Sequence, residues 1–374
     1  MDNRKAIGYV TANYTSMSAG ALLADRPLAS LPFAGRYRLV DFAISNMVNA
    51  GITTVGVVLP VKYRSLIDHL SSTQDWGLAR KRGGMYFMPG SAFGTSRHGM
   101  RFLLRDVIAS KSLFQRSEAP YVVMCGTNII FNIDLNEIID AHAASGADIT
   151  MAYVDAERSH GEGVLTLTLD EDGRVRGTES GVEPGQPKFL DCFVVGRDVL
   201  LRIIEEYAES DYLDVFEAIA GEFGRFDVRA FRFEGVALGV FGKNTYYHRS
   251  MDLLDPELAD RLFCPDRPIL TKSHDAPPAK YASGCAVRNS LVSADCIVGG
   301  TVEGSILSRK VVVEPGAVVR DSIIMQSCTV RAGAVVERAI IDKNNDIAEG
   351  SRLCGTLKDI LVVPKGPIAT VPVR

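Results

Sequence analysis

The chain has 374 residues, of which 47% are hydrophobic, and it carries a formal net charge of −4. This length and apolar content suffice for two folded domains, and the near-balance of charge excludes the basic field of a typical nucleic-acid-binding protein. The N-terminal stretch lacks the apolar segment of a secretion signal and no apolar run approaches the roughly 18 residues of a membrane span, so we expect a cytoplasmic protein that binds neither nucleic acid nor membrane.

The first predicted strand, "AIGYVT", runs into the loop "ANYTSMSAG". Many α/β enzymes hold a phosphate at this place through the backbone amides of a glycine-rich turn. Here the loop contains no glycine before Gly20. The segment therefore predicts the frame of a nucleotide-binding domain without its usual phosphate contact.

Short apolar runs then alternate with amphipathic stretches as far as residue 255. The runs "TTVGVVLP", "PYVVMC" and "ADITMAYV" have the composition of buried strands, whereas "RLVDFAISNMVNAG" and "MRFLLRDVIASKSLF" space their apolar residues as helices do. Gly51 stands where the first of these helices should end. The alternation predicts, over residues 1–255, an α/β domain with a mostly parallel sheet and helices on its faces.

A Pro-bearing linker, residues 256–280, precedes a change of period in residues 281–374. Aliphatic residues there recur in steps of six, and the step resumes after one residue is dropped: Ile306, Val312, Val318, Ile324, Val330, Val336, then Ile341, Ile347 and Leu353. This pattern is similar to a left-handed parallel β-helix, in which each hexapeptide forms one side of a triangular coil and points one aliphatic side chain inward. We favour it over an ordinary antiparallel sheet. Its exposed ends and flat faces predict association with another chain.

The segment "RPLASLPFAGRYRLVDFAISNMVNAGI" resembles the signature of the ADP-glucose pyrophosphorylase (glucose-1-phosphate adenylyltransferase) family. The similarity continues through "YVVMCGTNIIFNIDL", "YYHRSMDLL" and the hexapeptide segment, and so spans essentially the whole chain. The resemblance implies a Rossmann-like nucleotidyltransferase domain followed by a left-handed β-helix. It also implies a role in glycogen biosynthesis, for which the family makes ADP-glucose and pyrophosphate from ATP and glucose 1-phosphate.

Four devices that this family uses to hold ATP and Mg²⁺ are altered in this chain. The family's glycine-rich loop corresponds to residues 12–18 and ends in Ser18, and the lysine of its R-A-K-P motif corresponds to Leu28. Its two metal-binding aspartates correspond to Asn128 and Gly239. A neutral amide and a glycine are poor ligands for a hard cation, and the scattered cysteines and histidines show no zinc-ligand spacing. We therefore predict no metal site and no required cofactor, with Mg²⁺ only in a catalytic partner.

This degenerate site resembles that of the family's D-type subunit, a non-catalytic regulatory chain that assembles with a catalytic one. The resemblance implies a pseudoenzyme within a hetero-oligomer, a tetramer. A working nucleotidyltransferase that holds its metal with Asp41, Asp134 and Asp252 is one alternative, and a free-standing sugar-phosphate sensor is another. An acyltransferase is not favoured, because hexapeptide enzymes of that class use a histidine base and none follows His274.

Basic residues match positions at which the family gathers charge for anionic effectors: Arg26, Arg38, Arg309, Arg338 and Lys343. Clustered in a cleft between the domains, they would bind a phosphorylated small molecule. The alternative is that they are solvated surface cations, as we expect for other arginines of the chain such as Arg36 and Arg64. The stretch "WGLARKRGGMYFMPG" adds three cations and is interpreted either as a mobile loop or as an interface contact.

Overall fold

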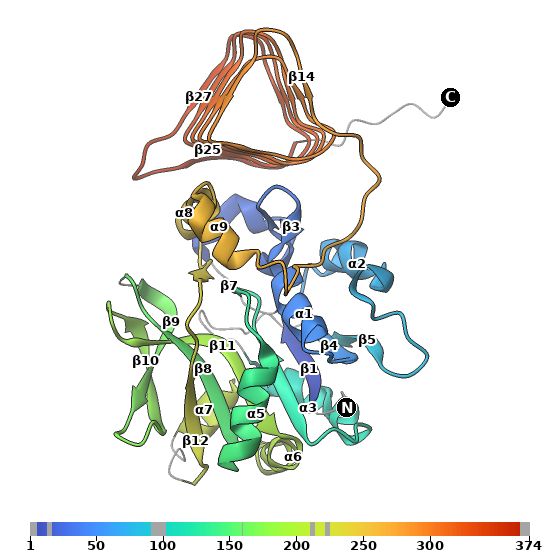
Figure 1. The fold of residues 1–374 in the computed structure, drawn as a ribbon, viewed down its shortest axis with the longest axis vertical. Coiled ribbons are helices and arrows are strands. Elements are labelled where there is room, and N and C mark those ends of the chain that lie inside the picture. The colour runs from blue at the N-terminus through green and yellow to red at the C-terminus, as the bar shows by residue number, and fades with distance from the viewer. Residues whose placement is uncertain are drawn as a thin grey trace.

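The computed structural model describes residues 6–12, 17–90, 102–158, 160–209, 214–220 and 225–366. It consists of an α/β domain and a β-helix that lies across one side of that domain (Figure 1). Within these residues, no helix combines the length and the apolar character needed to cross a membrane.

The α/β domain is built on a sheet in the order β10-β9-β11-β6-β1-β4-β5, to which β8 and β12 are joined through β11. β1 is parallel to β4 and β6, and β4 is parallel to β5, whereas β11 is antiparallel to β6 and β8. The sheet is therefore parallel across β6, β1, β4 and β5, and it is mixed in the part that contains β8 to β12. Its strands are β1 (Ala6–Thr11), β4 (Thr54–Leu59), β5 (Gly84–Pro89), β6 (Tyr121–Cys125), β8 (Ile149–Asp155), β9 (His160–Leu169), β10 (Val175–Val182), β11 (Pro187–Gly196) and β12 (Val228–Arg232).

Helices cover both faces of this sheet. Neighbouring residues of its central strands, which point to opposite faces, therefore pack in different cores. Val10 of β1 packs in one apolar cluster with Phe42, and Tyr9 packs in another with Phe114. The predicted end of the first helix is confirmed: the helix ends at Asn49, Ala50 is its C-cap, and Gly51 follows with a φ of 76°. The helices are α1 (Leu39–Asn49), α2 (Arg64–Leu70), α3 (Leu104–Ala109), α4 (Lys111–Gln115), α5 (Leu135–Ser145), α6 (Arg197–Glu206), α7 (Val215–Ala220), α8 (Lys243–Asp252) and α9 (Pro256–Leu262).

Short elements complete the domain near the β-helix. Two short strand pairs stand apart from the main sheet: β2 (Pro32–Phe33) with β3 (Tyr37–Arg38), and β7 (Ile129–Phe131) with β13 (Ala237–Gly239). Three 3₁₀ helices cover Met17–Leu23 (η1), Leu28–Ser30 (η2) and Thr73–Trp76 (η3). Trp76 is fully buried, whereas the cations Arg80, Lys81 and Arg82 that follow it are exposed.

The C-terminal domain is a parallel β-helix with a triangular cross-section (Figure 1). In its central coils, contacts between coils join residues 17 apart, as when Leu307 pairs with Ile324 and the next residue in that column is Ile341. Its first face comprises β14 (Lys280–Tyr281), β17 (Ile297–Val298), β20 (Val312–Val313), β23 (Thr329–Val330) and β26 (Asp346–Ile347). The second comprises β15 (Ala286–Arg288), β18 (Thr301–Glu303), β21 (Val318–Arg320), β24 (Val335–Glu337) and β27 (Arg352–Cys354). The third comprises β16 (Leu291–Val292), β19 (Ile306–Leu307), β22 (Ile323–Ile324), β25 (Ala339–Ile341) and β28 (Leu361–Val363).

The predicted inward-facing series is correct in its second half and wrong by one residue in its first half. From Ile324 onward the residues at the predicted steps pack inside the coil. Before it, the core instead takes the next residue in each case: Leu307, Val313 and Val319 in place of Ile306, Val312 and Val318. Each of these hexapeptides carries two adjacent aliphatic residues, so the spacing alone does not decide which of them points inward.

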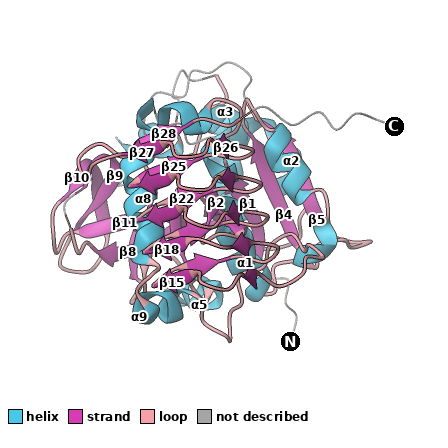
Figure 2. Ribbon diagram, turned by 90° about the horizontal axis from the view of Figure 1, so that it is seen from above, coloured by secondary structure: helices cyan, strands magenta, loops and turns pink. Residues whose placement is uncertain are grey.

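The third face of the β-helix, rather than one of its ends, rests on the α/β domain (Figures 1 and 2). Ile323, Met325 and Ile340 of this face belong to the same apolar cluster as Phe42 of α1. The segment between the domains starts with α9, whose Leu262 is buried in that cluster, and only residues 263–279 form an extended connector. The shared apolar cluster fixes the two domains against each other.

Candidate functional site

The positions aligned with the family's two metal-binding aspartates lie side by side in the α/β domain. β7 pairs with β13 so that Gly239 is opposite Ile129, and the Val240 N–H donates to the Asn128 carbonyl at 2.7 Å. The backbone frame that would bring two carboxylates together is therefore present. Gly239, however, offers no side chain, and a Cβ there would lie 2.3 Å from the Phe241 ring.

The Asn128 side chain is already engaged by the protein. Asn128 is fully buried, and its Nδ2 donates to Asp191 Oδ2 at 2.8 Å. Its Oδ1 has no hydrogen-bond partner among the described residues. One amide oxygen beside a carboxylate that already accepts a hydrogen bond does not suit Mg²⁺, which demands near-octahedral oxygen ligation. The residues present thus do not fit the metal of the family's reaction.

The alternative metal ligands do not come together. Asp41 accepts from His69 Nε2 at 2.6 Å, Asp134 caps α5 by accepting from the Asn136 N–H at 2.9 Å, and Asp252 pairs with Arg249 at 2.6 Å. Nowhere in the described parts of the chain do three or more His, Cys, Asp or Glu residues form a group that could hold a metal ion. The three aspartates therefore serve helix ends and ion pairs.

The other two degenerate positions differ in what can be said of them. Leu28 lies in η2 and is 1% exposed, packed in the apolar core. Residues 13–16 and the side chain of Ser18 lie outside the described residues. Lys188, which was not predicted from the sequence, donates to the Ala237 carbonyl at 3.2 Å and has Asp191 among its charged neighbours. Burial lowers the pKa of Lys188 to about 8, and nothing in the pattern of its strand distinguishes it.

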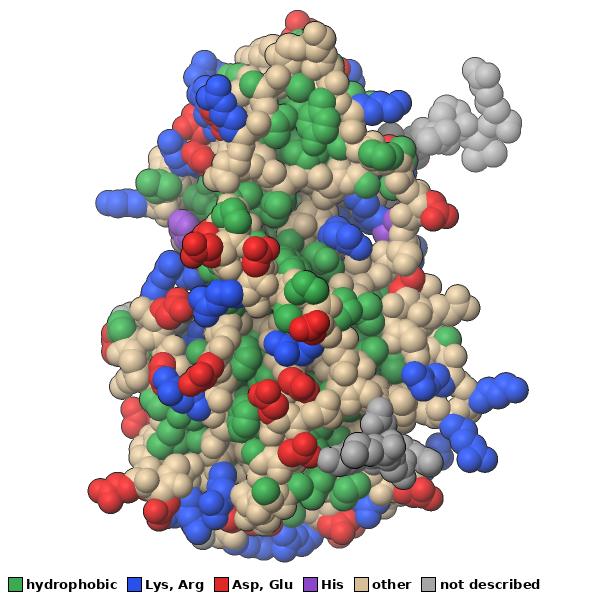
Figure 3. Space-filling view, in the orientation of Figure 1, with side chains coloured by type: hydrophobic (Ala, Val, Ile, Leu, Met, Phe, Trp, Pro, Cys, Tyr) green, Lys and Arg blue, Asp and Glu red, His purple; other side chains and the backbone are tan. Residues whose placement is uncertain are grey.

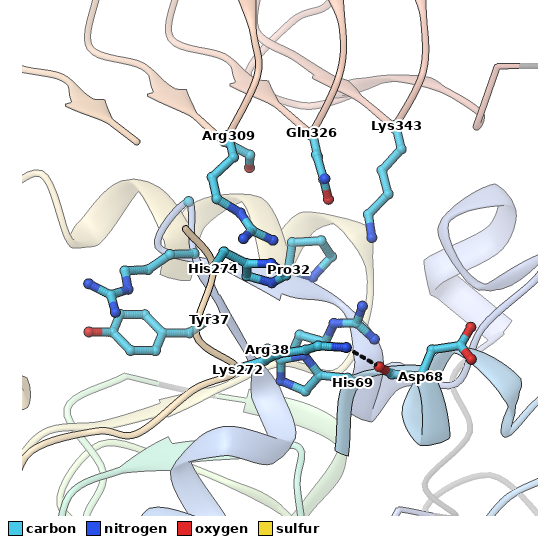
Figure 4. Close-up of a pocket in the computed structure, with 13 residues that line it drawn as sticks. Pro32, Tyr37, Arg38, Asp68, His69, Lys272, His274, Arg309, Gln326 and Lys343 are labelled. Atoms are coloured by element: carbon cyan, nitrogen blue, oxygen red, sulfur yellow. Dashed lines mark hydrogen bonds between the residues drawn. The ribbon is translucent and has the colours of Figure 1, made fainter. Parts of the chain in front are cut away.

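A second place gathers charge, at the waist between the two domains (Figure 3). A cleft of about 240 Å³ opens there between β3, the connector and one corner of the β-helix (Figure 4). Its lining residues include five Lys or Arg side chains: Arg36, Arg38, Lys272, Arg309 and Lys343. Asp68 is the one carboxylate among the described residues that line it. This cationic cleft is the candidate ligand site.

The β-helix supplies the upper wall of the cationic cleft through its coil repeat. Arg309, Gln326 and Lys343 occupy the same corner in successive coils, each 17 residues after the last, and all three point into the cleft (Figure 4). The repeat therefore turns three residues distant in sequence into one row of polar side chains. Gln326 could have been predicted from this spacing once Arg309 and Lys343 were chosen.

The lower wall comes from the α/β domain and the connector. Arg38 points upward toward Lys343, and Lys272 of the connector donates to the Asp68 carbonyl at 2.7 Å (Figure 4). Arg36, expected from sequence to be an ordinary surface arginine, also lines the cleft. A second hollow of about 360 Å³ adjoins it and shares Arg36, Lys272, His274 and Arg309. The connector residues were missed because no repeat or motif fixes the path of a linker.

Two of the five predicted effector residues are not part of the cationic cleft. Arg26 is buried and forms an ion pair with Asp342, one residue before Lys343, so that its charge is already neutralised. Arg338 lies at another corner of the coil, between β24 and β25, and pairs with Glu337 at 2.7 Å. The structure therefore brings together Arg38, Arg309 and Lys343 of the predicted set.

The cationic cleft has an excess of positive charge, and several of its side chains have lowered pKa values. Burial and the nearby Arg38 and Arg26 lower the pKa of Lys343 to about 7, and burial lowers that of Arg38 to about 10. Burial and then Arg36 lower the pKa of Arg309, and burial and then Arg309 lower that of His274 to about 4. Burial is the largest cause of each depression and a neighbouring cation adds to it, so a bound anion would favour the charged form of these side chains.

His69 forms the floor of the cleft. Burial lowers the pKa of its imidazole, against the opposing effect of its hydrogen bond to Asp41. Its ring packs edge-on against Trp76, with 5.5 Å between the ring centroids. The imidazole is thus held from two sides, by Asp41 and by Trp76, beneath a cationic opening that suits an oxyanion held by charge and hydrogen bonds.

The fold and the degenerate site define a nucleotidyltransferase-type domain joined to a hexapeptide β-helix. Two family descriptions match accordingly, "Nucleotidyl transferase" over residues 24–179 and "GlmU-like, C-terminal hexapeptide" over residues 277–357. The chain is 33% identical over 373 residues to the glycogen biosynthesis protein GlgD of Bacillus subtilis (strain 168). The aligned region covers 98% of this chain and 97% of that protein.

Other relatives agree. The chain is 33% identical over 319 residues to the GlgD protein of Geobacillus stearothermophilus (84% of this chain, 83% of that one). It is 30% identical over 342 residues to the glucose-1-phosphate adenylyltransferase of Streptomyces avermitilis (83% and 82%). The chain belongs to the family formed by the GlgD proteins and the glucose-1-phosphate adenylyltransferases, which confirms the resemblance seen in its sequence.

Proposed function

We propose that this protein is a regulatory, catalytically inactive subunit of ADP-glucose pyrophosphorylase in glycogen synthesis. Its partner is a catalytic chain that makes ADP-glucose and pyrophosphate from ATP and glucose 1-phosphate, and that chain alone requires Mg²⁺. The observation that carries the proposal is the placement of Asn128 and Gly239: they are juxtaposed as a metal-binding pair would be, yet they supply no carboxylate. The similarity to proteins named GlgD supports the role in glycogen synthesis.

An inactive chain can act on an active one through their interface. A partner that binds the active arrangement of the catalytic chain more tightly than the inactive one raises the population of the active arrangement. Apolar surface for such contact exists on the first face of the β-helix, where Tyr281 is 55% exposed and Ile297 48% exposed. The result is a hetero-oligomer, a tetramer, in which this chain contributes regulation and not turnover.

Mixing the two purified chains tests the proposal. The mass of the mixture, measured by native mass spectrometry, should correspond to an assembly that contains both chains. A chain that stays apart from its catalytic counterpart at micromolar concentrations would overturn the subunit assignment. That outcome would favour a free-standing sensor, which would use the same cationic cleft without a partner.

We further propose that the cationic cleft binds a phosphorylated small-molecule effector. Among the described residues that line the cleft are five Lys or Arg side chains and the amide of Gln326, against one carboxylate, that of Asp68. Guanidinium and ammonium groups in this arrangement bind phosphate oxygens through charge-assisted hydrogen bonds. Regulation would then follow if the effector has different affinities for the two arrangements of the oligomer.

Sulfate, a tetrahedral dianion like phosphate, should stabilise the folded chain. At a hundred times its dissociation constant, a ligand that binds only the folded state adds about 2.7 kcal/mol, which is a rise of several degrees in Tm. Thermal unfolding in sodium sulfate, compared with sodium chloride of equal ionic strength, measures this. The double variant Arg309→Ala, Lys343→Gln should lose most of the rise. The control Arg320→Ala removes an exposed arginine paired with Glu303 on another face and should keep the rise. Equal shifts in all three proteins would exclude the cleft as the site.

A further inference from the structure

Lys343 stands out among the cations of the cleft by its position. It lies at the corner between β25 and β26, and its side chain points down toward Arg38 (Figure 4). The charged groups near it are Asp342 on its own corner, Arg26 and Arg38 from the α/β domain, and Lys365 from the segment after β28. The other charged or titratable side chains that line the same cleft are Arg36, Tyr37, Asp68, His69, Lys272, His274 and Arg309.

The carboxylate of Asp342, which adjoins Lys343, is already engaged. One oxygen of Asp342 accepts from the Arg26 guanidinium, and the other accepts from the backbone N–H of Lys343 at 2.7 Å. Asp342 is 1% exposed, so water cannot free it for a new partner. The ammonium of Lys343 therefore faces guanidinium groups on one side and a shared carboxylate on the other, in a largely buried position.

We propose that Lys343 takes up one proton when an oxyanion binds in the cationic cleft, so that phosphorylated ligands bind more tightly as the pH falls through neutrality. The inference rests on the proposed ligand site and adds its coupling to pH. The only covalent change is a proton transfer: the neutral amine of Lys343 gains an N–H bond, the buffer acid loses that proton, and the resulting ammonium contacts the dianion. An opposite charge within hydrogen-bond distance favours the charged form of an amine, and the affinity must then depend on pH by linkage.

The sign follows from the free protein. Since the pKa of unliganded Lys343 is about 7, the amine is charged below neutrality and is ready for the anion without a proton. Above neutrality the proton must be supplied on binding, and the affinity for a ligand of fixed charge falls by up to about tenfold per pH unit until the pKa of the liganded state is reached.

The other groups of the cleft titrate in different ranges. The pKa of His274 is about 4 and that of His69 is lowered, so an anion that raises them produces proton uptake on the acid side of neutrality. The pKa of Arg38 is about 10, and this side chain stays charged across neutral pH. Proton uptake on the alkaline side of neutrality therefore reports Lys343.

Calorimetric titration of the full chain with sodium sulfate tests the coupling, because the charge of sulfate is constant near neutral pH. Titrations in buffers of different ionisation enthalpy, at fixed ionic strength, give the number of protons taken up. We expect Lys343 to contribute almost none at a pH about one unit below 7, where uptake comes from His69 and His274, and close to one at a pH one to two units above 7. The sulfate affinity of the wild type should fall over the same interval.

Variants separate the coupling from the charge. Lys343→Arg keeps a cation that does not titrate, and it should bind sulfate with an affinity that no longer falls above neutral pH. Lys343→Gln should bind more weakly around neutral pH and take up no proton on the alkaline side of neutrality. The exposed Lys280→Arg, at the far end of the β-helix, should retain the wild-type pH dependence.

The outcomes are distinct. Sulfate binding without proton uptake, or an unchanged pH dependence in Lys343→Arg, would overturn the coupling and leave the ligand site standing. No binding at any pH by the folded wild type would overturn both the site and its coupling. Neither result bears on assembly with a catalytic chain, which is measured separately.

Discussion

Supplied alone with ATP, Mg²⁺ and glucose 1-phosphate, the purified chain should form ADP-glucose at least about 10⁴-fold more slowly than a chain with a complete site. Losing one preorganised charge-stabilising group costs about 3 kcal/mol of barrier, and groups that act as a unit are lost together. Here Asn128 and Gly239 supply no metal-binding carboxylate, and Leu28 is buried where the family has a lysine. Chromatographic detection of ADP-glucose over hours measures the rate.

Restoring the two carboxylates should not restore turnover. In the double variant Asn128→Asp, Gly239→Asp, the first new carboxylate replaces an amide whose nitrogen lies 2.8 Å from Asp191 Oδ2. Two carboxylates at that distance hold a proton between them in preference to both ionising. The second new carboxylate, in place of Gly239, requires Phe241 to move, because the Cβ of the new side chain would lie 2.3 Å from the Phe241 ring. We expect a lower Tm than in the wild type and no turnover above it.

The control for this variant is Asn244→Asp. Asn244 is exposed in the first turn of α8, where an added negative charge is tolerated by the helix dipole, so the folded chain should keep its Tm. Mg²⁺-dependent formation of ADP-glucose by the double variant would mean that the remainder of the site is intact. That result would contradict the interpretation that the whole site is degenerate.

The second large effect concerns the buried ion pair between the domains. Asp342→Asn should lower the free energy of unfolding by about 3 kcal/mol or more, because a buried guanidinium without its counterion is strongly unfavourable. The side chains of Arg26 and Asp342 are 8% and 1% exposed, so water cannot replace the lost charge. The midpoint of urea unfolding, followed by the fluorescence of the single tryptophan, measures the change.

Two further variants isolate the cause. Asp346→Asn removes an exposed partner of Arg331 on the β-helix surface and should cost at most about 1 kcal/mol. Arg26→Met combined with Asp342→Asn removes the unpaired charge and should recover part of the loss. If Asp342→Asn were no more damaging than Asp346→Asn, the ion pair would have no role in holding the domains together.

Much of the α/β domain could be predicted from the sequence because its signals are local. The β1 and β4 strands and the α1 helix follow from apolar spacing, and the end of α1 follows from Gly51. The β-helix follows from its step of six. Which residue of each step points inward could not be predicted, since both members of the pairs Ile306–Leu307 and Val312–Val313 are aliphatic. The surface of the other domain decides the matter for Ile306, which lies near Gly35.

The candidate site was predictable only in part, for a similar reason. Arg309 and Lys343 share a corner because the coil repeats, and repeats are visible in sequence. Arg38 joins them through the docking of two domains, and Lys272 joins through the path of the connector, neither of which has a local signal. The same docking removes Arg26 from the site by pairing it with Asp342. A count of matching basic positions therefore overestimates the number that face a ligand.

The central claim, that an inactive chain works by adjusting an active one, is tested most directly by the rate of ADP-glucose formation in the mixture. The catalytic chain is assayed at fixed substrate while this chain is added up to and beyond equal amounts. We predict a change of about fivefold or more in kcat or in the half-saturating concentration of substrate or effector, complete at a fixed ratio of the two chains. A rate that never departs from that of the catalytic chain alone, or family-like turnover by this chain on its own, would contradict it.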